Sequence, residues 1–179
     1  GTAIADVLFG DYNPGGRLPV TFYKSVDDLP SFEDYHTDGR TYRFFRGQPL
    51  YPFGYGLSYT TFQYSNLRAD KATLSSGDSV TFSVDVRNSG KRAGDEVVQL
   101  YASYPGSAVE RPVKELKAYR RVTLQPGQTR TVSLTVKADD LRYWDPAANR
   151  WTLEAKPVRF QVGGSSADVR GEMEVRSEK

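Results

Sequence analysis

Seven short segments of alternating apolar and polar residues constrain the fold of this chain more than any other feature. In "SVTFSVDV", residues 79–86, the apolar side chains share one face: Val80, Phe82, Val84 and Val86. Turns such as "NSGKRAG" and "QPGQ" separate such segments. The other six are "TFQYSNLRA", "DEVVQLYASY", "KELKAYRRVTL", "TRTVSLTV", "PVRFQVGG" and "DVRGEMEV". This pattern predicts a mainly β protein, an antiparallel two-sheet sandwich of the immunoglobulin or fibronectin III type.

The first 23 residues have a different character. "TAIADVLFG" carries apolar residues at helical spacing and ends at Gly10, where a helix C-cap glycine is expected. "DYNPGG" is a turn, and Pro19 in "RLPVTF" favours an edge strand or the start of one. A helix end, a turn and one strand cannot form a core. We therefore expect residues 1–23 to end an α/β domain whose larger part, with any targeting signal, precedes Gly1.

Residues 24–50 show no periodicity and are rich in Asp, Pro, Gly and aromatic residues, which predicts a long connecting loop. "YPFGYGLSYTTF", residues 51–62, then combines aromatic rings with glycine and proline, which break regular elements. Further along, "ADDLRYWD", residues 138–145, is predicted to form a helical turn between strands, capped by Asp139.

Composition excludes several kinds of site. The chain has no cysteine, so it can form neither disulfides nor thiolate metal sites. Its net charge of +2 gives no electrostatic case for nucleic acid or an anionic membrane. His36 is the only histidine, and we interpret it as an exposed loop residue rather than a metal ligand. We therefore expect no metal and no cofactor.

Two groups of residues have both a structural and a chemical interpretation. Neighbouring carboxylates on a strand point to opposite faces, so we interpret four acidic pairs as solvated charge rather than a glycosidase-like dyad: Asp27–Asp28, Glu33–Asp34, Asp95–Glu96 and Asp139–Asp140. Four aromatic residues either fill or cover the sandwich core or form a sugar-stacking platform, and we favour the core: Tyr101, Tyr104, Trp144 and Trp151.

Four long motifs, in order along the chain, carry a specific resemblance: "GTAIADVLFGDYNPGGRLPVTF", "YPFGYGLSYTTF", "NSGKRAGDEVVQLY" and "RPVKELKAYRRVTLQPGQTRTVSLTV". Together they closely resemble the C-terminal part of family 3 glycoside hydrolases, the β-glucosidase and β-xylosidase family. The resemblance implies three parts: a remnant of the family's α/β sandwich domain over 1–23, an interdomain loop and aromatic seam over 24–61, and a fibronectin type III-like domain over 62–179.

The resemblance also implies where the catalytic residues lie. The family's aspartate nucleophile belongs to an N-terminal barrel domain, and its acid/base is usually a glutamate of the α/β sandwich domain. Both are expected upstream of Gly1, and no residue here matches either motif, so no catalytic residue is assigned. The implied mechanism is retaining hydrolysis through a covalent glycosyl-enzyme, without a metal.

Two sets of residues are then candidates for a functional role. The aromatic stretch is interpreted as an interdomain seam that buries its rings against both neighbours: Tyr51, Phe53, Gly54, Tyr55, Gly56, Leu57, Tyr59 and Phe62. The long loop is a possible cleft-facing element, with five candidate residues: Glu33, Asp34, Asp38, Arg40 and Tyr42.

The predicted function is that of a structural and docking portion of a periplasmic or extracellular, exo-acting β-glycosidase. Its partners would be the catalytic domains of the same polypeptide and the parent's oligosaccharide substrate, and neither nucleic acid nor a membrane. "DGRTYRFF", residues 38–45, resembles the β-xylosidase-type members somewhat more than the simplest β-glucosidases. The alternatives are a carbohydrate-binding module, which requires exposed aromatics on the sandwich, and a passive immunoglobulin-like domain, which requires no apolar seam.

Overall fold

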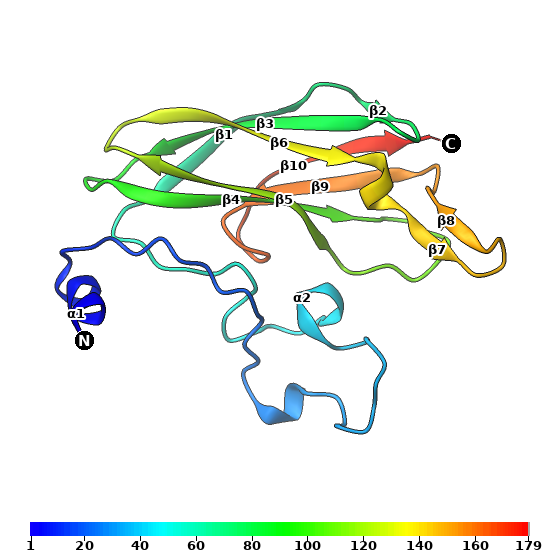
Figure 1. The fold of residues 1–179 in the computed structure, drawn as a ribbon, viewed down its shortest axis with the longest axis horizontal. Helices are drawn as coiled ribbons and strands as arrows, with labels where there is room; N and C mark the ends of the chain where they lie inside the picture. Colours follow the sequence, from blue (N-terminus) through cyan, green and yellow to red (C-terminus); the bar gives the residue numbers. More distant parts are fainter. Residues whose placement is uncertain (179) are drawn as a thin grey trace.

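A computed structural model describes residues 1–178 of the chain as a two-layered β-sandwich with an irregular first third beneath it (Figure 1). The smaller sheet has the order β1 (Phe62–Ala69), β3 (Ser79–Asn88) and β6 (Thr129–Lys137). The larger sheet has the order β2 (Thr73–Leu74), β10 (Val169–Ser177), β9 (Pro157–Gly163), β4 (Gly94–Ser103) and β5 (Glu115–Leu124).

All seven strands expected from the alternating pattern are present, which confirms the mainly β sandwich. Their neighbours are antiparallel, and the short added strand β2 pairs with β10 in parallel. The core lies between the sheets because the apolar phase of each strand faces inward, as for Val80, Val84 and Val86 of β3. Across the core, the rings of Phe82 and Phe160 lie 4.5 Å apart. Each such side chain contributes about 1.5–3 kcal/mol when it is fully buried.

The connection after β6 differs from the predicted helical turn. A 3₁₀ turn, η2, covers only Ala138–Leu141, and a hairpin of β7 (Tyr143–Asp145) and β8 (Arg150–Thr152) follows. The carboxylate of Asp140, not that of Asp139, accepts the hydrogen bond from the Lys137 backbone N–H at the start of the turn. The predicted cap was therefore wrong, and Asp139 pairs with Arg142 instead.

The first third of the chain contains little regular structure. Helix α1 (Thr2–Phe9) ends at Gly10, whose φ of 87° is the left-handed conformation expected for a C-cap glycine. Among the described residues, the segment "RLPVTF" pairs through one bridge, Phe22 with Tyr51. Two short turns interrupt the long loop: η1 (Val26–Asp28) and α2 (Thr41–Phe44). None of the helices within residues 1–178 has the length and apolar character needed to cross a membrane.

Candidate functional site

The aromatic stretch 51–62 touches the sandwich along one side. The ring of Phe53 stacks on that of Tyr42 with centroids 4.2 Å apart, and Tyr42 meets the buried Tyr101 of β4 edge to face. The Phe53 carbonyl accepts a hydrogen bond from the Ser166 N–H at 2.9 Å. Phe62 begins β1 and packs against the core. Phe53 and Phe62 therefore attach the stretch to the sandwich within this chain.

The other side of the stretch touches residues 1–23. Tyr51 exchanges two backbone hydrogen bonds with Phe22, and the Tyr55 carbonyl accepts one from the Leu18 N–H. The Tyr59 hydroxyl donates to the Val7 carbonyl at 2.6 Å, at the end of α1. Tyr51, Leu57 and Tyr59 nevertheless remain exposed. The stretch thus lies between two segments, with part of its apolar surface uncovered.

Two glycines permit these close approaches. Gly54 has a φ of 80°, and a Cβ there would lie 2.1 Å from Oε1 of Gln99. A Cβ on Gly56 would lie 2.4 Å from the backbone oxygen of Gly16. Gln99 is buried on β4, and its amide donates to the carbonyls of Gly54 and Gly164 at 3.2 and 2.6 Å. These glycines allow the backbone of the stretch to lie directly on its neighbours.

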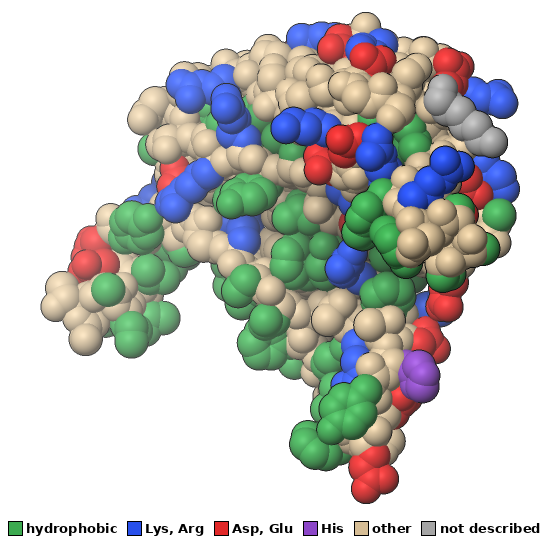
Figure 2. Space-filling view, turned by 45° about the vertical axis from the view of Figure 1, so that its right-hand side comes forward, with side chains coloured by type: hydrophobic (Ala, Val, Ile, Leu, Met, Phe, Trp, Pro, Cys, Tyr) green, Lys and Arg blue, Asp and Glu red, His purple; other side chains and the backbone are tan. Residues whose placement is uncertain are grey.

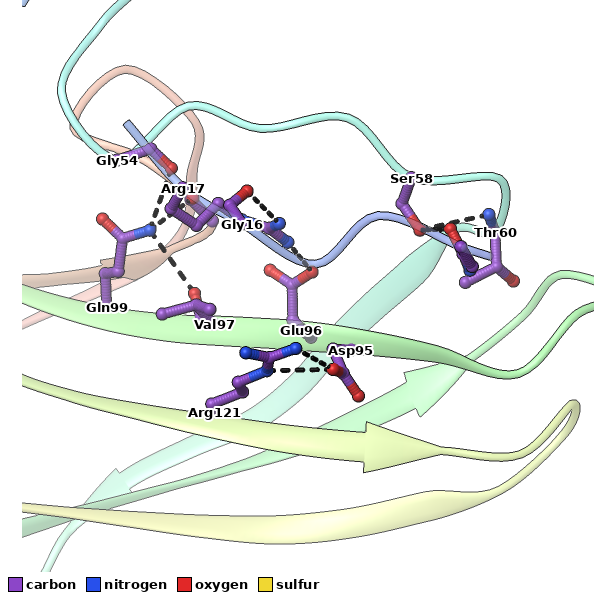
Figure 3. A network of polar contacts seen from close by, with 12 residues as sticks. Gly16, Arg17, Gly54, Ser58, Thr60, Asp95, Glu96, Val97, Gln99 and Arg121 are labelled. Carbon is purple, nitrogen blue, oxygen red and sulfur yellow. Dashed lines mark hydrogen bonds and ion pairs between the residues drawn. The ribbon is translucent and has the colours of Figure 1, made fainter. Parts of the chain in front are cut away.

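A buried ion pair joins the first third to the sandwich (Figure 3). Nη2 of Arg17 lies 3.0 Å from Oε2 of Glu96, and the two side chains are 12% and 7% exposed. The Tyr64 hydroxyl donates to the other oxygen of Glu96 at 2.7 Å. Removal from water raises the pKa of the Glu96 carboxyl above its usual 4.5, although the hydrogen bond from Tyr64 and the charge of Arg17 act in the opposite direction.

Glu96 corrects one sequence-based interpretation. The sequence pattern predicts solvated charge for the pair Asp95–Glu96, but both residues lie on β4 and Glu96 is buried. Asp95, on the opposite face, bonds Arg121 and Thr123 of β5. The sequence contained the signal, because Glu96 is in phase with the inward Val98 and Leu100. A carboxylate in an apolar phase needs a buried partner, and that partner, Arg17, is distant in sequence.

Asn13 is a second connecting residue that the sequence analysis missed. Its amide donates to the Ala93 carbonyl just before β4, at 2.8 Å. Its side-chain oxygen accepts from the Tyr59 N–H and the Ser58 hydroxyl, at 2.8 and 3.1 Å. Asn13 therefore ties the first turn to both the aromatic stretch and the sandwich.

The five candidate residues of the long loop divide into two groups. Arg40 and Tyr42 turn inward: the Arg40 guanidinium bonds backbone carbonyls of the loop, and the Tyr42 hydroxyl accepts from the Leu116 N–H at 3.0 Å. Glu33 and Asp38 are exposed, and Asp34 bonds the exposed His36. Hydrogen bonds from the backbone and ring of His36 hold the pKa of the Asp34 carboxyl below its usual 3.8.

Most of the exposed large hydrophobic side chains that the structure describes belong to residues 1–59. In Figure 2 hydrophobic side chains gather on the lower part of the molecule, below the more polar sandwich. A groove of about 600 Å³ lies there, lined by Val7, Leu18, Phe22, Tyr51, Tyr55 and Leu57 among others. We define the apolar face as this groove together with five exposed hydrophobic residues of the same first third of the chain: Ile4, Leu8, Phe9, Val20 and Leu50.

The predicted aromatic group of the sandwich is split between two environments. Tyr101 is buried and Tyr104 packs against the core, as the favoured interpretation expected. Trp144 and Trp151 instead face each other across the β7–β8 hairpin with centroids 5.8 Å apart. Trp151 is 61% exposed, and Tyr119 on β5 is 68% exposed.

Comparison with known proteins gives matches over nearly the whole chain. Residues 1–59 match the glycosyl hydrolase family 3 C-terminal domain, and residues 96–166 match a fibronectin type III-like domain. A periplasmic beta-glucosidase of Salmonella typhimurium is 42% identical over 95% of this chain and 24% of its own length. A xylan 1,4-beta-xylosidase of Xylanibacter ruminicola is 44% identical over 94% of this chain and 19% of its own length.

Solved structures agree with these matches. The chain superposes on a beta-D-glucoside glucohydrolase from Trichoderma reesei with a TM-score of 0.88 at 34% identity, covering 99% of this chain and 29% of that one. For a beta-glucosidase from Kluyveromyces marxianus the TM-score is 0.87 at 38% identity. The chain spans about a quarter of the length of the relatives that it matches.

Proposed function

Since this chain belongs to glycoside hydrolase family 3, whose C-terminal domain and fibronectin type III-like domain it matches, we propose that it is the non-catalytic C-terminal part of a retaining, exo-acting β-glucosidase or β-xylosidase. Its proposed role is to dock onto the catalytic part of the same polypeptide and to complete that part's α/β domain. The proposed substrates are β-linked oligosaccharides that end in glucose or xylose.

The apolar face is the observation that carries this proposal. All eight residues of α1 are exposed or half-buried, and Leu8 and Phe9 project their side chains into solvent. A helix of this length has little stability in water unless it packs against something. An apolar groove with several exposed hydrophobic side chains around the same segment of chain marks a candidate interaction site. Because the family members matched here are about four times longer, the proposed occupant is the preceding part of the polypeptide.

In this proposal the aromatic stretch 51–62 is the seam between the two parts. Phe53 and Phe62 hold it to the sandwich, while Tyr51, Leu57 and Tyr59 keep surface available for the catalytic part. The Arg17–Glu96 pair and the hydrogen bonds of Asn13 would fix how the first third of the chain lies against the sandwich. A flexible linker would need none of these contacts.

The acidic residues of the chain support a non-catalytic role. A retaining glycosidase needs two carboxyl groups about 5–5.5 Å apart across a cleft. Of the acidic pairs, Asp95–Glu96 has a buried residue, Glu96. Asp95 forms an ion pair with Arg121, and Glu96 forms one with Arg17. We further propose a periplasmic or extracellular location, as the name of the Salmonella relative indicates for that protein.

The proposal is tested by comparing the 179-residue chain with the full-length polypeptide that carries it. The full-length protein should hydrolyse an aryl β-glucoside or β-xyloside with retention of anomeric configuration, and the chain alone should not. Addition of the chain to a polypeptide truncated before Gly1 should restore stability or activity if the apolar face docks there. Turnover by the chain alone, or a full-length protein inactive on every β-glycoside, would refute the proposal.

A second function, carbohydrate binding by the sandwich itself, is favoured by one observation. Trp151 and Tyr119 are more than half exposed, as a sugar-binding module requires. Retention of the chain on insoluble cellulose or xylan, lost in Trp151→Ala, would establish this function. Equal retention of the two proteins would exclude Trp151 as a binding residue.

A further inference from the structure

The long loop is braced along its length. The Arg40 guanidinium donates to the carbonyls of Ser31 and His36 at 3.2 and 2.9 Å, and it also bonds the Asp34 carbonyl. At the base, the Tyr23 hydroxyl accepts from the Thr41 N–H at 2.8 Å. Polar groups within the chain therefore fix the conformation of residues 31–41.

This bracing places two aromatic rings almost entirely in solvent. Phe32 is 93% exposed and Tyr35 is 89% exposed, and both lie within the segment that Arg40 holds. We call residues 31–38 the loop tip. It lies on the portion of the chain that projects away from the sandwich between η1 and α2 (Figure 1). A fixed loop that displays rings loses little conformational entropy when it binds a ligand.

The charge around these rings distinguishes the loop tip from the apolar face. Glu33, Asp34 and Asp38 belong to the same eight-residue loop tip as Phe32 and Tyr35, and Nδ1 of His36 lies 2.7 Å from Oδ1 of Asp34. In Figure 2 the purple histidine lies near acidic and hydrophobic side chains on one projection. The apolar face, by contrast, is mainly aliphatic and aromatic. Buried cores of protein interfaces are depleted in charged residues, so the composition of the tip favours a hydroxyl-rich ligand over a protein surface.

Sugars have the matching chemistry. A pyranose presents C–H groups on its face, which pack on aromatic rings, and hydroxyl groups at its rim, which bond carboxylates and imidazoles. We propose that the loop tip of residues 31–38 binds the leaving-group end of an oligosaccharide substrate, with Phe32 and Tyr35 as stacking residues and Glu33 and His36 as hydrogen-bonding residues. This inference rests on the proposed function and deepens it, because it assigns substrate-length selectivity to this chain.

The test compares two substrates of the full-length enzyme. A β-glycosyl fluoride occupies only the site of the sugar that is released, whereas a linear tetrasaccharide of the same sugar also extends beyond it. In Phe32→Ala/Tyr35→Ala, kcat/KM for the tetrasaccharide should fall about tenfold, since two stacking contacts are lost. For the fluoride it should change less than about twofold. Val109→Ala, which truncates an exposed apolar side chain in the connection between β4 and β5, is the control and should alter neither value.

Three other outcomes would overturn the inference or the proposed function. Equal losses for both substrates together with a lower melting temperature would mean that the tip packs against protein, and unchanged kinetics would mean that it binds no substrate. If the wild-type protein hydrolyses neither compound, the proposed function fails. The tip is then judged by titration of the tetrasaccharide into the full-length protein, where an unchanged Kd in the double variant, or no measurable binding, overturns the inference.

Discussion

At the scale of single residues, the Arg17–Glu96 pair shows how a charged contact can position two parts of a chain at an energetic cost. Both groups lose most of their hydration, and the raised pKa of Glu96 shows that its partners do not fully offset this loss. The two members of the pair should therefore respond differently to substitution.

Arg17→Met should destabilise the protein by about 3–5 kcal/mol at neutral pH, because it leaves the Glu96 carboxylate buried and unpaired. Glu96→Gln should behave differently. Since the folded-state pKa of Glu96 lies above its unfolded value, ionisation lowers stability as the pH rises through the unfolded and folded pKa values. The stability of Glu96→Gln relative to wild type should therefore increase from about pH 4 toward neutrality.

Urea unfolding of both variants between pH 4 and 8 checks this expectation. The loss caused by Arg17→Met should shrink toward acid pH as Glu96 becomes protonated. A pH-independent loss in Arg17→Met would show that the loss does not arise from the Glu96 charge. A Glu96→Gln variant that becomes less stable than wild type as the pH rises would show that the charged pair stabilises the fold.

Gly54→Ala tests the close approach of the stretch to β4. Gly54 and Gly77 have nearly equal φ values, 80° and 82°, but a Cβ meets Gln99 only at Gly54, while at Gly77 nothing lies within 4 Å. Gly77→Ala should cost about 1–2 kcal/mol for the backbone alone. Gly54→Ala should cost about 1–3 kcal/mol more because the buried Gln99 amide loses its partners. Equal losses in chemical denaturation would mean that Gln99 moves aside freely.

At the scale of elements, the strands could be predicted because each carries its own pattern of two-residue period, and the sandwich follows from burying those faces. The β7–β8 hairpin could not be predicted from the sequence. The segment "ADDLRYWD" contains both the start of a helical turn and a strand that is too short to show alternation. The contacts of the aromatic stretch were only partly predictable. Rings between glycines indicate a packed irregular segment, but long-range partners such as Arg17 and Gln99 depend on tertiary placement.

Phe53→Ala and Leu57→Ala separate the two sides of the proposed seam. Phe53 is half-buried within this chain, so its truncation should cost about 2 kcal/mol and lower the melting temperature by roughly 5 °C even in the chain alone. Leu57 is exposed here, so its truncation should lower the melting temperature only in the full-length protein. Calorimetry of both variants, in the chain alone and in the full-length protein, measures these shifts. An equal melting-temperature shift for Leu57→Ala in the two proteins would refute an interdomain seam.

At the scale of the whole molecule, the chain combines a sandwich that has its own buried core with a first third that contains few buried apolar side chains. Helix α1 is held by a few polar contacts, such as the one between the Tyr59 hydroxyl and the Val7 carbonyl, rather than by burial. This division leads us to expect two levels of stability in one chain.

Hydrogen exchange measures that difference. In the 179-residue chain, amides of residues 3–9 should exchange orders of magnitude faster than those of residues 80–86 in β3, whose inward side chains are fully buried. In the full-length protein, residues 3–9 should become protected if the proposed catalytic part covers the apolar face. Comparable protection of the two segments in the chain alone would place α1 within the stable unit of the sandwich.

The position of β10 has a consequence for the order in which this protein is made. β10 lies between β2 and β9 in the larger sheet and follows every other strand of the sandwich in sequence. During synthesis, the ribosome therefore releases the apolar face and the seam well before the sheet can close. If the proposed catalytic part precedes this chain, we expect α1 and its groove to pack against that part first, and the sandwich to complete its folding last. A product truncated before Val169 would lack β10, so the larger sheet could not close. We expect such a product to be readily degraded.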